Sequence, residues 1–160
     1  YGDVSLSDSV VQMSKLDQHS APDKSTGGGT VVAITRGLRG EASVIVNETN
    51  IASKLGSGSV PVFGTPALIA LMERAAVNAL RSHLEEGEDS VGVSVNVRHL
   101  AATPMGKRVR AEAEVTAVEG KKITFAVRAF DSQEKVGEGT HERVLIDREA
   151  FIWKIASKGS

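Results

Sequence analysis

The longest amphipathic pattern in the chain lies at residues 65–84, TPALIALMERAAVNALRSHL, and it predicts one long helix. Thr65 followed by Pro66 fits an N-cap and a first helical position, because a threonine hydroxyl can accept a helix N–H and proline has no N–H to leave unpaired. At about 100° per residue, the polar side chains gather in one narrow wedge and the remaining surface is apolar. We therefore expect other elements, most simply a sheet, to wrap this helix. The wedge consists of Arg74, Asn78, Arg81 and Glu85.

Alternation of apolar and polar residues, which is typical of half-buried strands, occurs before and after the helix. A first strand of about six residues is expected from Gly40. After the helix, the odd positions of residues 91–99, four valines and His99, should share one face, with Gly92 on the opposite face. Further strands are expected at 108–117, 123–129 and 135–146, joined by a hairpin at Glu119-Gly120 and a turn at Asp131–Glu134.

The start of the chain has a different composition. Residues 1–30 are rich in Ser, Asp and Gly and are interpreted as a flexible tail or linker. Apolar residues between Val4 and Leu16 leave a short docking helix as an alternative, and residues 31–35 are either a short strand or the end of the linker. The predicted division is a tail at 1–36 and one folded domain at 37–158.

The order of elements predicts an α+β fold. A strand is followed by a long loop at 47–64, the helix, four antiparallel strands, and a short final helix at 148–156 that Asp147 should cap. Loops as long as 47–64 are usually lids, binding loops or disordered segments. An antiparallel sheet of about five strands wrapped round one long helix satisfies these patterns. Such a sheet leaves an exposed edge, so we expect a homodimer, or a tetramer built from it.

Composition narrows the function classes. The 160 residues, 41% hydrophobic and 24% charged, suit one globular domain. A net charge of −1 gives no indication of a nucleic-acid or membrane surface, and no stretch approaches the roughly 20 apolar residues of a membrane span. Without cysteine, disulfides and thiolate chemistry are excluded. We expect an intracellular, cytoplasmic protein; because the numbering opens at Tyr1 rather than Met, an organellar location stays open.

Glu73 is the one helical residue that the amphipathic pattern does not explain. It lies outside the polar wedge, with Ile69, Val77 and Leu80 as its neighbours around the helix. An ionised carboxylate there must be paired, raised in pKa, or open to a cleft. It is either a structural ion pair at a subunit interface, or a general base or nucleophile whose reactivity depends on partial desolvation.

Two further residues are candidates because of where they stand in the elements. His99 ends a strand face made of valines, where a histidine is commonly a structural core residue. An imidazole close to Glu73 could instead transfer a proton or orient the carboxylate. Thr65 is a cap by default, but amide groups at a helix start can also stabilise an oxyanion.

Other polar residues give weaker signals. His19, His83 and His141 have no metal-site spacing, and we interpret them as solvated or structural, with no metal site predicted. The Gly137-x-Gly139 pair is too short for a dinucleotide fingerprint and indicates close backbone approach within a strand. The basic residues Arg98, Lys107, Arg108 and Arg110 fit a solvated strand face better than a phosphate site.

Three runs of sequence together resemble a known family. TPALIALMERAA, VGVSVNVRHLAATPMGKRVRAEAEV and GEGTHERVLIDREAF are similar to the hotdog-fold acyl-CoA thioesterases of the fluoroacetyl-CoA thioesterase type, over roughly residues 37–155. The resemblance implies the hotdog fold and homodimers whose sites form between subunits. It also implies thioester hydrolysis by a helix-start threonine, a helix glutamate two turns later and a strand histidine, with no metal or redox cofactor.

Those roles fall on Thr65, Glu73 and His99, and Gly92 matches a glycine that lets substrate approach the strand. Phe63 and Gly64, directly before the helix, are expected to contact substrate; Phe63 is the one aromatic residue in the stretch LGSGSVPVFG.

The leading prediction is a homodimeric thioesterase that cleaves a small or medium acyl-CoA to free acid and CoA. A non-catalytic acyl-CoA binding or sensing module on the same fold is the alternative, because fold does not determine function. An enoyl-thioester hydratase is a third possibility. It ranks last because it needs a His and Asp pair near the helix start, and the only aspartate between Thr65 and His99 is Asp89, in the loop after the helix.

Overall fold

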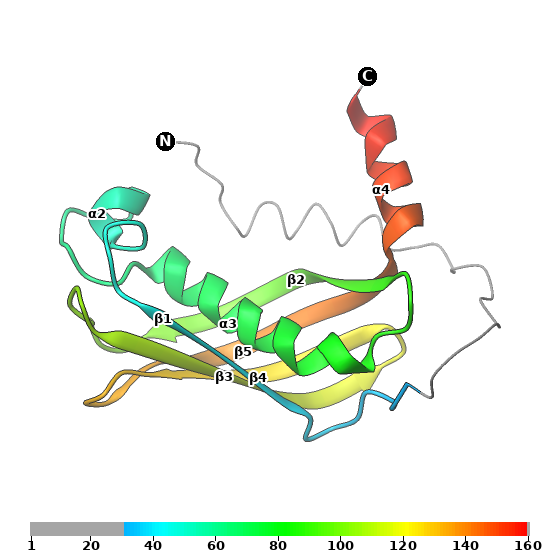
Figure 1. Cartoon of the computed structure of the whole chain (residues 1–160), viewed down its shortest axis with the longest axis horizontal. Coiled ribbons are helices and arrows are strands. Elements are labelled where there is room, and N and C mark those ends of the chain that lie inside the picture. The colour runs from blue at the N-terminus through cyan, green and yellow to red at the C-terminus, as the bar shows by residue number, and fades with distance from the viewer. Residues whose placement is uncertain (1–30, 160) are drawn as a thin grey trace.

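The computed structural model describes residues 31–159, and the predictions for the tail at 1–30 lie outside this range. Five strands form one antiparallel sheet in the order β1-β3-β4-β5-β2, and α3 lies along one face of it (Figure 1). Residues 31–35 form no strand. The strands are β1 (Arg39–Ile45), β2 (Glu88–His99), β3 (Arg108–Glu119), β4 (Lys122–Phe130) and β5 (Lys135–Asp147). The helices are α2 (Ala52–Leu55), α3 (Thr65–Leu80) and α4 (Arg148–Ala156), with short 3₁₀ turns η1 (Arg81–His83) and η2 (Ser157–Gly159).

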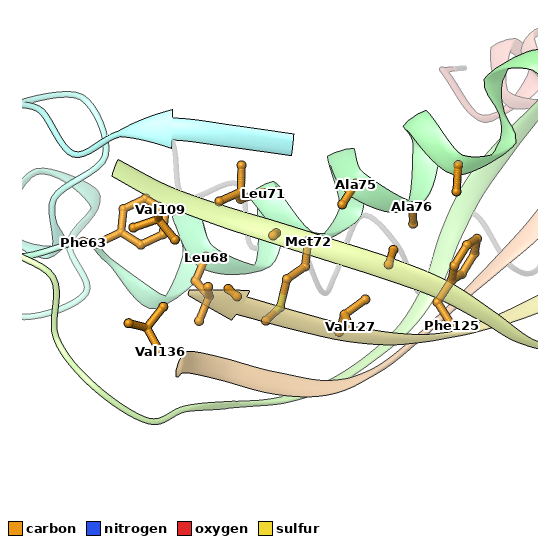
Figure 2. Close-up of a cluster of buried hydrophobic side chains, with 14 of the residues drawn as sticks. Phe63, Leu68, Leu71, Met72, Ala75, Ala76, Val109, Phe125, Val127 and Val136 are labelled. Atoms are coloured by element: carbon orange, nitrogen blue, oxygen red, sulfur yellow. The ribbon is translucent and has the colours of Figure 1, made fainter. Parts of the chain in front are cut away.

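The apolar side of α3 packs on the sheet and forms the core, as its pattern predicted. Leu68 and Met72 of α3 belong to one cluster of buried side chains that also contains Val127 and Phe125 of β4 (Figure 2). These residues are essentially removed from water, and full burial of such a side chain stabilises the fold by about 1.5–3 kcal/mol. The buried residues of α3 are Leu68, Leu71, Met72, Ala75, Ala76, Ala79 and Leu80.

Glycines bring the backbones close at two places on this sheet. A Cβ on Gly40 of β1 would lie 2.3 Å from the carbonyl oxygen of Ala75, so β1 can pack directly on α3 only without a side chain there. A Cβ on Gly139 of β5 would lie 2.0 Å from the carbonyl oxygen of Asn96 on β2. The predicted close backbone approach in the Gly137-x-Gly139 segment is therefore confirmed.

The start of α3 differs from the prediction. Gly64 is the N-cap, with φ −77° and ψ 145°, and Thr65 is the first helical residue, followed by Pro66. No side chain caps this end, because the Thr65 hydroxyl forms a hydrogen bond with a histidine instead. The other end is also shorter than expected, since the α-helix stops at Leu80 and one 3₁₀ turn follows.

The predicted valine face of β2 is wrong in its first half. The register between β2 and β5 shifts directly after Gly92, where Val93 is an extra residue in the ladder. Gly92 pairs with Arg143, and Val95 pairs with His141. Directly paired residues point to the same face, so Gly92 and Val95 both face α3. A bulge of this kind reverses the alternation locally, and a strict period of two cannot reveal it.

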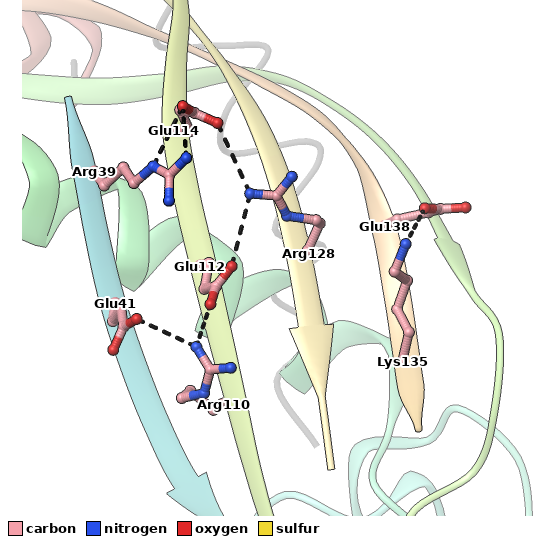
Figure 3. Close-up of polar contacts among 8 residues, drawn as sticks. All are labelled: Arg39, Glu41, Arg110, Glu112, Glu114, Arg128, Lys135 and Glu138. Carbon is pink, nitrogen blue, oxygen red and sulfur yellow. Dashed lines mark hydrogen bonds and ion pairs between the residues drawn. The ribbon is translucent and has the colours of Figure 1, made fainter. Parts of the chain in front are cut away.

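The opposite face of the sheet carries a ladder of ion pairs (Figure 3). Arg110 pairs with Glu41 at 3.2 Å and also with Glu112, and Arg39 pairs with Glu114 at 3.2 Å. The arginines here are open to solvent, where each pair contributes only about 0–1 kcal/mol. The prediction that Arg110 belongs to a solvated strand face is confirmed.

Local signals in the turns behave as the sequence indicated. The Asp147 carboxylate accepts a hydrogen bond from the Ala150 amide at 2.9 Å and caps α4, which extends away from the sheet (Figure 1). The loop at 47–64 contains the short helix α2, which was not predicted.

None of the helices within residues 31–159 is long and apolar enough to cross a membrane. The cytoplasmic location and the domain boundary at residue 36 stay predictions.

Candidate active site

The first part of the site joins the start of α3 to the end of β2. Thr65 Oγ1 lies 2.8 Å from His99 Nδ1, a hydrogen-bond distance. Burial lowers the pKa of His99 below its ordinary value, so the imidazole is mainly neutral near pH 7. Its other nitrogen, Nε2, is buried and has no hydrogen-bond partner among the described residues. The Ala101 backbone also acts on this imidazole, and its hydrogen bond raises the pKa against the larger effect of burial.

The second part of the site surrounds Glu73 in the middle of α3. Its side chain is 17% exposed, and its Oε2 accepts a hydrogen bond from Arg143 Nη1 at 3.1 Å. His141 Nε2 lies 3.8 Å from the same oxygen. Desolvation raises the pKa of Glu73 although Arg143 pulls in the opposite direction. The carboxylate is thus paired and yet more basic than an exposed glutamate, which suits a general base or nucleophile.

Arg143 is held by β2 as well as by Glu73. Its Nε donates to Ser90 Oγ at 2.9 Å, and its Nη2 donates to the Ser90 carbonyl oxygen at 3.0 Å. The side chain is 7% exposed, and burial lowers its pKa while Glu73 opposes that change. The arginine therefore links β5, β2 and α3 at the position of the carboxylate.

Gly92 lets the Glu73 carboxylate pack closely against β2. A Cβ on Gly92 would lie 2.5 Å from Glu73 Oε2 and 3.1 Å from Cε1 of His141. Any other residue would displace the carboxylate. The structure thus places Gly92 beside Glu73, and the approach of substrate to this strand stays a prediction.

A single chain does not bring the three predicted catalytic residues into one contact. His99 contacts Thr65, whereas Glu73 contacts Arg143 and His141. Thr65 and Glu73 are eight residues apart on α3, which is about 12 Å along the helix axis. Each chain therefore holds two separate groups of candidate residues, one at the start of α3 and one at its middle.

Phe63 and Gly64 lie in packed surroundings. Phe63 is 1% exposed and packs in the core with Leu68 (Figure 2), and its amide donates to the Thr103 carbonyl. A Cβ on Gly64 would lie 2.9 Å from the Leu55 side chain. Both residues fix the loop before α3, and their contact with substrate stays a prediction.

Sequence reasoning missed Arg143, and of the solvated and structural roles left open for His141, the structure excludes the solvated one. Both lie at alternate positions of β5 on the face toward α3, and both are buried. The available signal was the period of two within residues 135–146, which places two polar side chains on the strand face that must cover the helix. Within residues 31–159, no group of three or more His, Asp or Glu side chains could hold a metal ion.

Known proteins share this fold and this stretch of sequence. The family model described as fluoroacetyl-CoA-specific thioesterase matches residues 46–149, which include Thr65, Glu73, His99 and Arg143. A fluoroacetyl-CoA thioesterase from Streptantibioticus cattleyicolor is 43% identical over 97 residues, 61% of this chain and 70% of that protein.

Solved structures of thioesterases also superpose on this chain. The fluoroacetyl-CoA thioesterase FlK superposes with a TM-score of 0.75 at 34% identity, over 81% of this chain and all of that chain. A variant of that enzyme in complex with fluoroacetate and CoA gives a TM-score of 0.70 at 35% identity, covering 74% and 99% of the two chains. A thioesterase superfamily member from Thermus thermophilus gives 0.71 at 28% identity, covering 78% and 95%. The predicted hotdog fold is confirmed by these likenesses.

Proposed function

Since this chain belongs to the fluoroacetyl-CoA-specific thioesterase family and is an acyl-CoA thioester hydrolase, we propose that it cleaves a small or medium acyl-CoA to free acid and CoA, with Glu73 as the reactive carboxylate. The observation that supports the assignment is the position of Glu73, largely desolvated on an apolar helix and packed closely against Gly92 of β2. The related enzymes are named for fluoroacetyl-CoA, a two-carbon acyl thioester, which supports a small acyl group.

Two routes use the same carboxylate. As a general base, Glu73 removes a proton from water, which attacks the thioester carbonyl; the tetrahedral intermediate then expels the CoA thiolate, which takes up a proton. As a nucleophile, Glu73 attacks the carbonyl itself, the C–S bond breaks, and water then hydrolyses the resulting anhydride. Both routes need an ionised carboxylate with raised basicity, and burial provides this at Glu73.

His99 and Thr65 assist at the reacting carbonyl. The Thr65 hydroxyl fixes one ring nitrogen of His99 and leaves Nε2 directed away from the helix start for contact with substrate. In the tautomer with hydrogen on Nε2, the imidazole donates to the developing oxyanion; in the other, it accepts a proton. Amide groups in the first turn of α3 add positive potential at this place.

We further propose that two copies of the chain complete each site. β2 is an edge strand of 12 residues, and its half-buried valines offer a surface for a second copy. In a two-fold antiparallel pairing of β2 with β2, the end of one strand lies beside the beginning of the other. Gly92 is the fifth residue of β2 and His99 the last, so a pairing centred between Val95 and Asn96 would place His99 opposite Gly92 of the partner subunit, beside the partner's Glu73.

A hydrolysis screen tests the proposed function. Acyl-CoAs of increasing chain length are incubated with the purified chain, the released CoA thiol is trapped with a chromogenic reagent, and the free acid is quantified. We expect equal amounts of thiol and acid, with the highest kcat/KM among the short and medium chains. Release from long chains alone would contradict the substrate size, and CoA-ester binding without thiol release would contradict hydrolysis.

A further inference from the structure

His141 is a buried histidine that the proposed reaction leaves without a role. It lies on β5, is 1% exposed, and its ring stacks on Phe125 with the centroids 6.2 Å apart. Both of its ring nitrogens have polar neighbours: Nδ1 lies 2.8 Å from the Ser94 carbonyl oxygen, and Nε2 lies 3.3 Å from Arg143 Nη1. Buried polar atoms normally have partners, and here one of the two partners is the arginine that contacts Glu73.

These contacts determine which nitrogen carries the proton. The Ser94 carbonyl can only accept, so the hydrogen is on Nδ1. Burial lowers the pKa of His141 to about 4, so the ring is neutral near pH 7 and Nε2 has a free lone pair. Arg143 Nη1 can only donate, and it therefore donates to this lone pair.

Both hydrogens of Arg143 Nη1 then have a hydrogen-bond acceptor. One goes to Glu73 Oε2 at 3.1 Å and the other to His141 Nε2 at 3.3 Å, while Ser90 holds the rest of the guanidinium. The planar group cannot rotate toward the carboxylate without losing the bond to His141. His141 Nε2 also lies 3.8 Å from Glu73 Oε2, so the imidazole, the guanidinium and the carboxylate form one compact cluster.

We propose that His141 is a positioning residue that acts through Arg143: by accepting the second Nη1 hydrogen, it limits the ion pair to a single contact and keeps Glu73 basic enough to react. The inference rests on the proposed role of Glu73. The charged or titratable groups that face Glu73 from the packed strands are Arg143 and His141 of β5, and Asp89 of β2 acts on Arg143.

Two substitutions separate the contacts of His141. His141→Gln keeps an acceptor near the position of Nε2 but cannot donate to Ser94, whereas His141→Asn can donate to Ser94 but has no atom near Arg143. The matched control is Val127→Ala, a buried core change on the neighbouring strand β4. The readouts are kcat/KM against pH with the best acyl-CoA, and the carboxyl pKa of Glu73 from ¹³C NMR.

We expect His141→Asn to lower the carboxyl pKa of Glu73, and with it the apparent pKa of the acid limb of kcat/KM, by about half a pH unit or more. The kcat should fall about tenfold. In His141→Gln and Val127→Ala, the apparent pKa of the acid limb should equal that of the wild type even if the melting temperature is lower. An unchanged limb in His141→Asn, or equal shifts in all three variants, would overturn the proposal.

A measurement on the unaltered protein covers the case in which a variant fails to fold. Imidazole ¹⁵N NMR should show His141 neutral, with hydrogen on Nδ1, from pH 5.5 to 8; hydrogen on Nε2 would overturn the acceptor role. Full activity of Glu73→Gln would instead defeat the proposed function, and the NMR result would stand apart from it.

Discussion

Gly92 of β2 and Glu73 of α3 approach so closely that a Cβ on the glycine would lie 2.5 Å from Oε2 of the carboxylate. Gly92→Ala should therefore displace the carboxylate and lower kcat/KM at least about tenfold, because misplacement of a reacting group by about 1 Å is costly. The check is steady-state hydrolysis beside Gly137→Ala, whose Cβ would meet the Leu68 and Met72 side chains. If both variants lose activity equally, the effect comes from packing and not from Glu73.

The Thr65 hydroxyl contacts His99 and caps no amide at the start of α3. Thr65→Val should lower kcat by about 10²-fold or more, and Thr65→Ser should keep most of it, because only the hydroxyl holds the imidazole. Loss of a true N-cap costs about 1 kcal/mol, but Thr65→Val should change the free energy of unfolding by less than about 0.5 kcal/mol. Kinetics and urea unfolding together check this; a stability loss with unchanged kcat would restore the capping role.

The proposal that two copies of the chain complete each site predicts recovery of activity on mixing. Glu73→Ala and His99→Ala should each be inactive, yet equal amounts exchanged into mixed dimers should give about one quarter of wild-type activity. Half of the dimers are then mixed, and each has one complete site of two. Sedimentation should show dimers for both variants. Dimers that exchange subunits without recovery would place each site within one chain.

Stability should fall when the pH drops below neutrality, and His141 should be a main cause. Its pKa lies near 4 in the folded chain and near 6.5 when unfolded, so the unfolded chain binds more protons between these values. Its contribution is complete above about pH 6.5 and is lost toward pH 4, by at most about 3 kcal/mol. Glu73, whose pKa is raised, contributes with the opposite sign.

Urea unfolding at several pH values checks this prediction. The free energy of unfolding of His141→Gln should change less between pH 6.5 and 4 than that of the wild type, because the variant has no group there that titrates. The comparison uses slopes, so a constant loss of packing in the variant does not matter. Equal slopes would show that His141 is already exposed to protons in the folded state.

The strands and α3 were predictable because burial of one face determines how often apolar residues recur along each element. The apolar surface of α3 required a sheet around it, and alternation located every strand to within a few residues. The bulge at Val93 was not predictable from the sequence, because the valines alternate regularly through it. The extra residue nevertheless changes which side chains before it face α3. The start of α3 was missed by one residue because Thr65 has a tertiary partner, His99, that local capping rules do not include.

The site was predictable only in part. Glu73 could be selected because a carboxylate among apolar neighbours needs an explanation. His99 was selected because it ends a strand face made of valines, and Gly92 because of the family resemblance. The partners of Glu73 come from β5, 70 residues later in the chain for Arg143. Pairing at that separation depends on strand order and register, which the pattern of a single sequence does not specify.

Hydrolysis by Glu73→Gln tests the central claim most directly, because glutamine keeps the size and the Arg143 contact of the side chain but cannot act as a base or form an anhydride. Thiol release from the best acyl-CoA is measured beside the wild type at equal dimer concentration. We expect kcat at least about 10²-fold lower with the melting temperature preserved. Turnover within a few-fold of the wild type would contradict the role of Glu73 and the mechanism built on it.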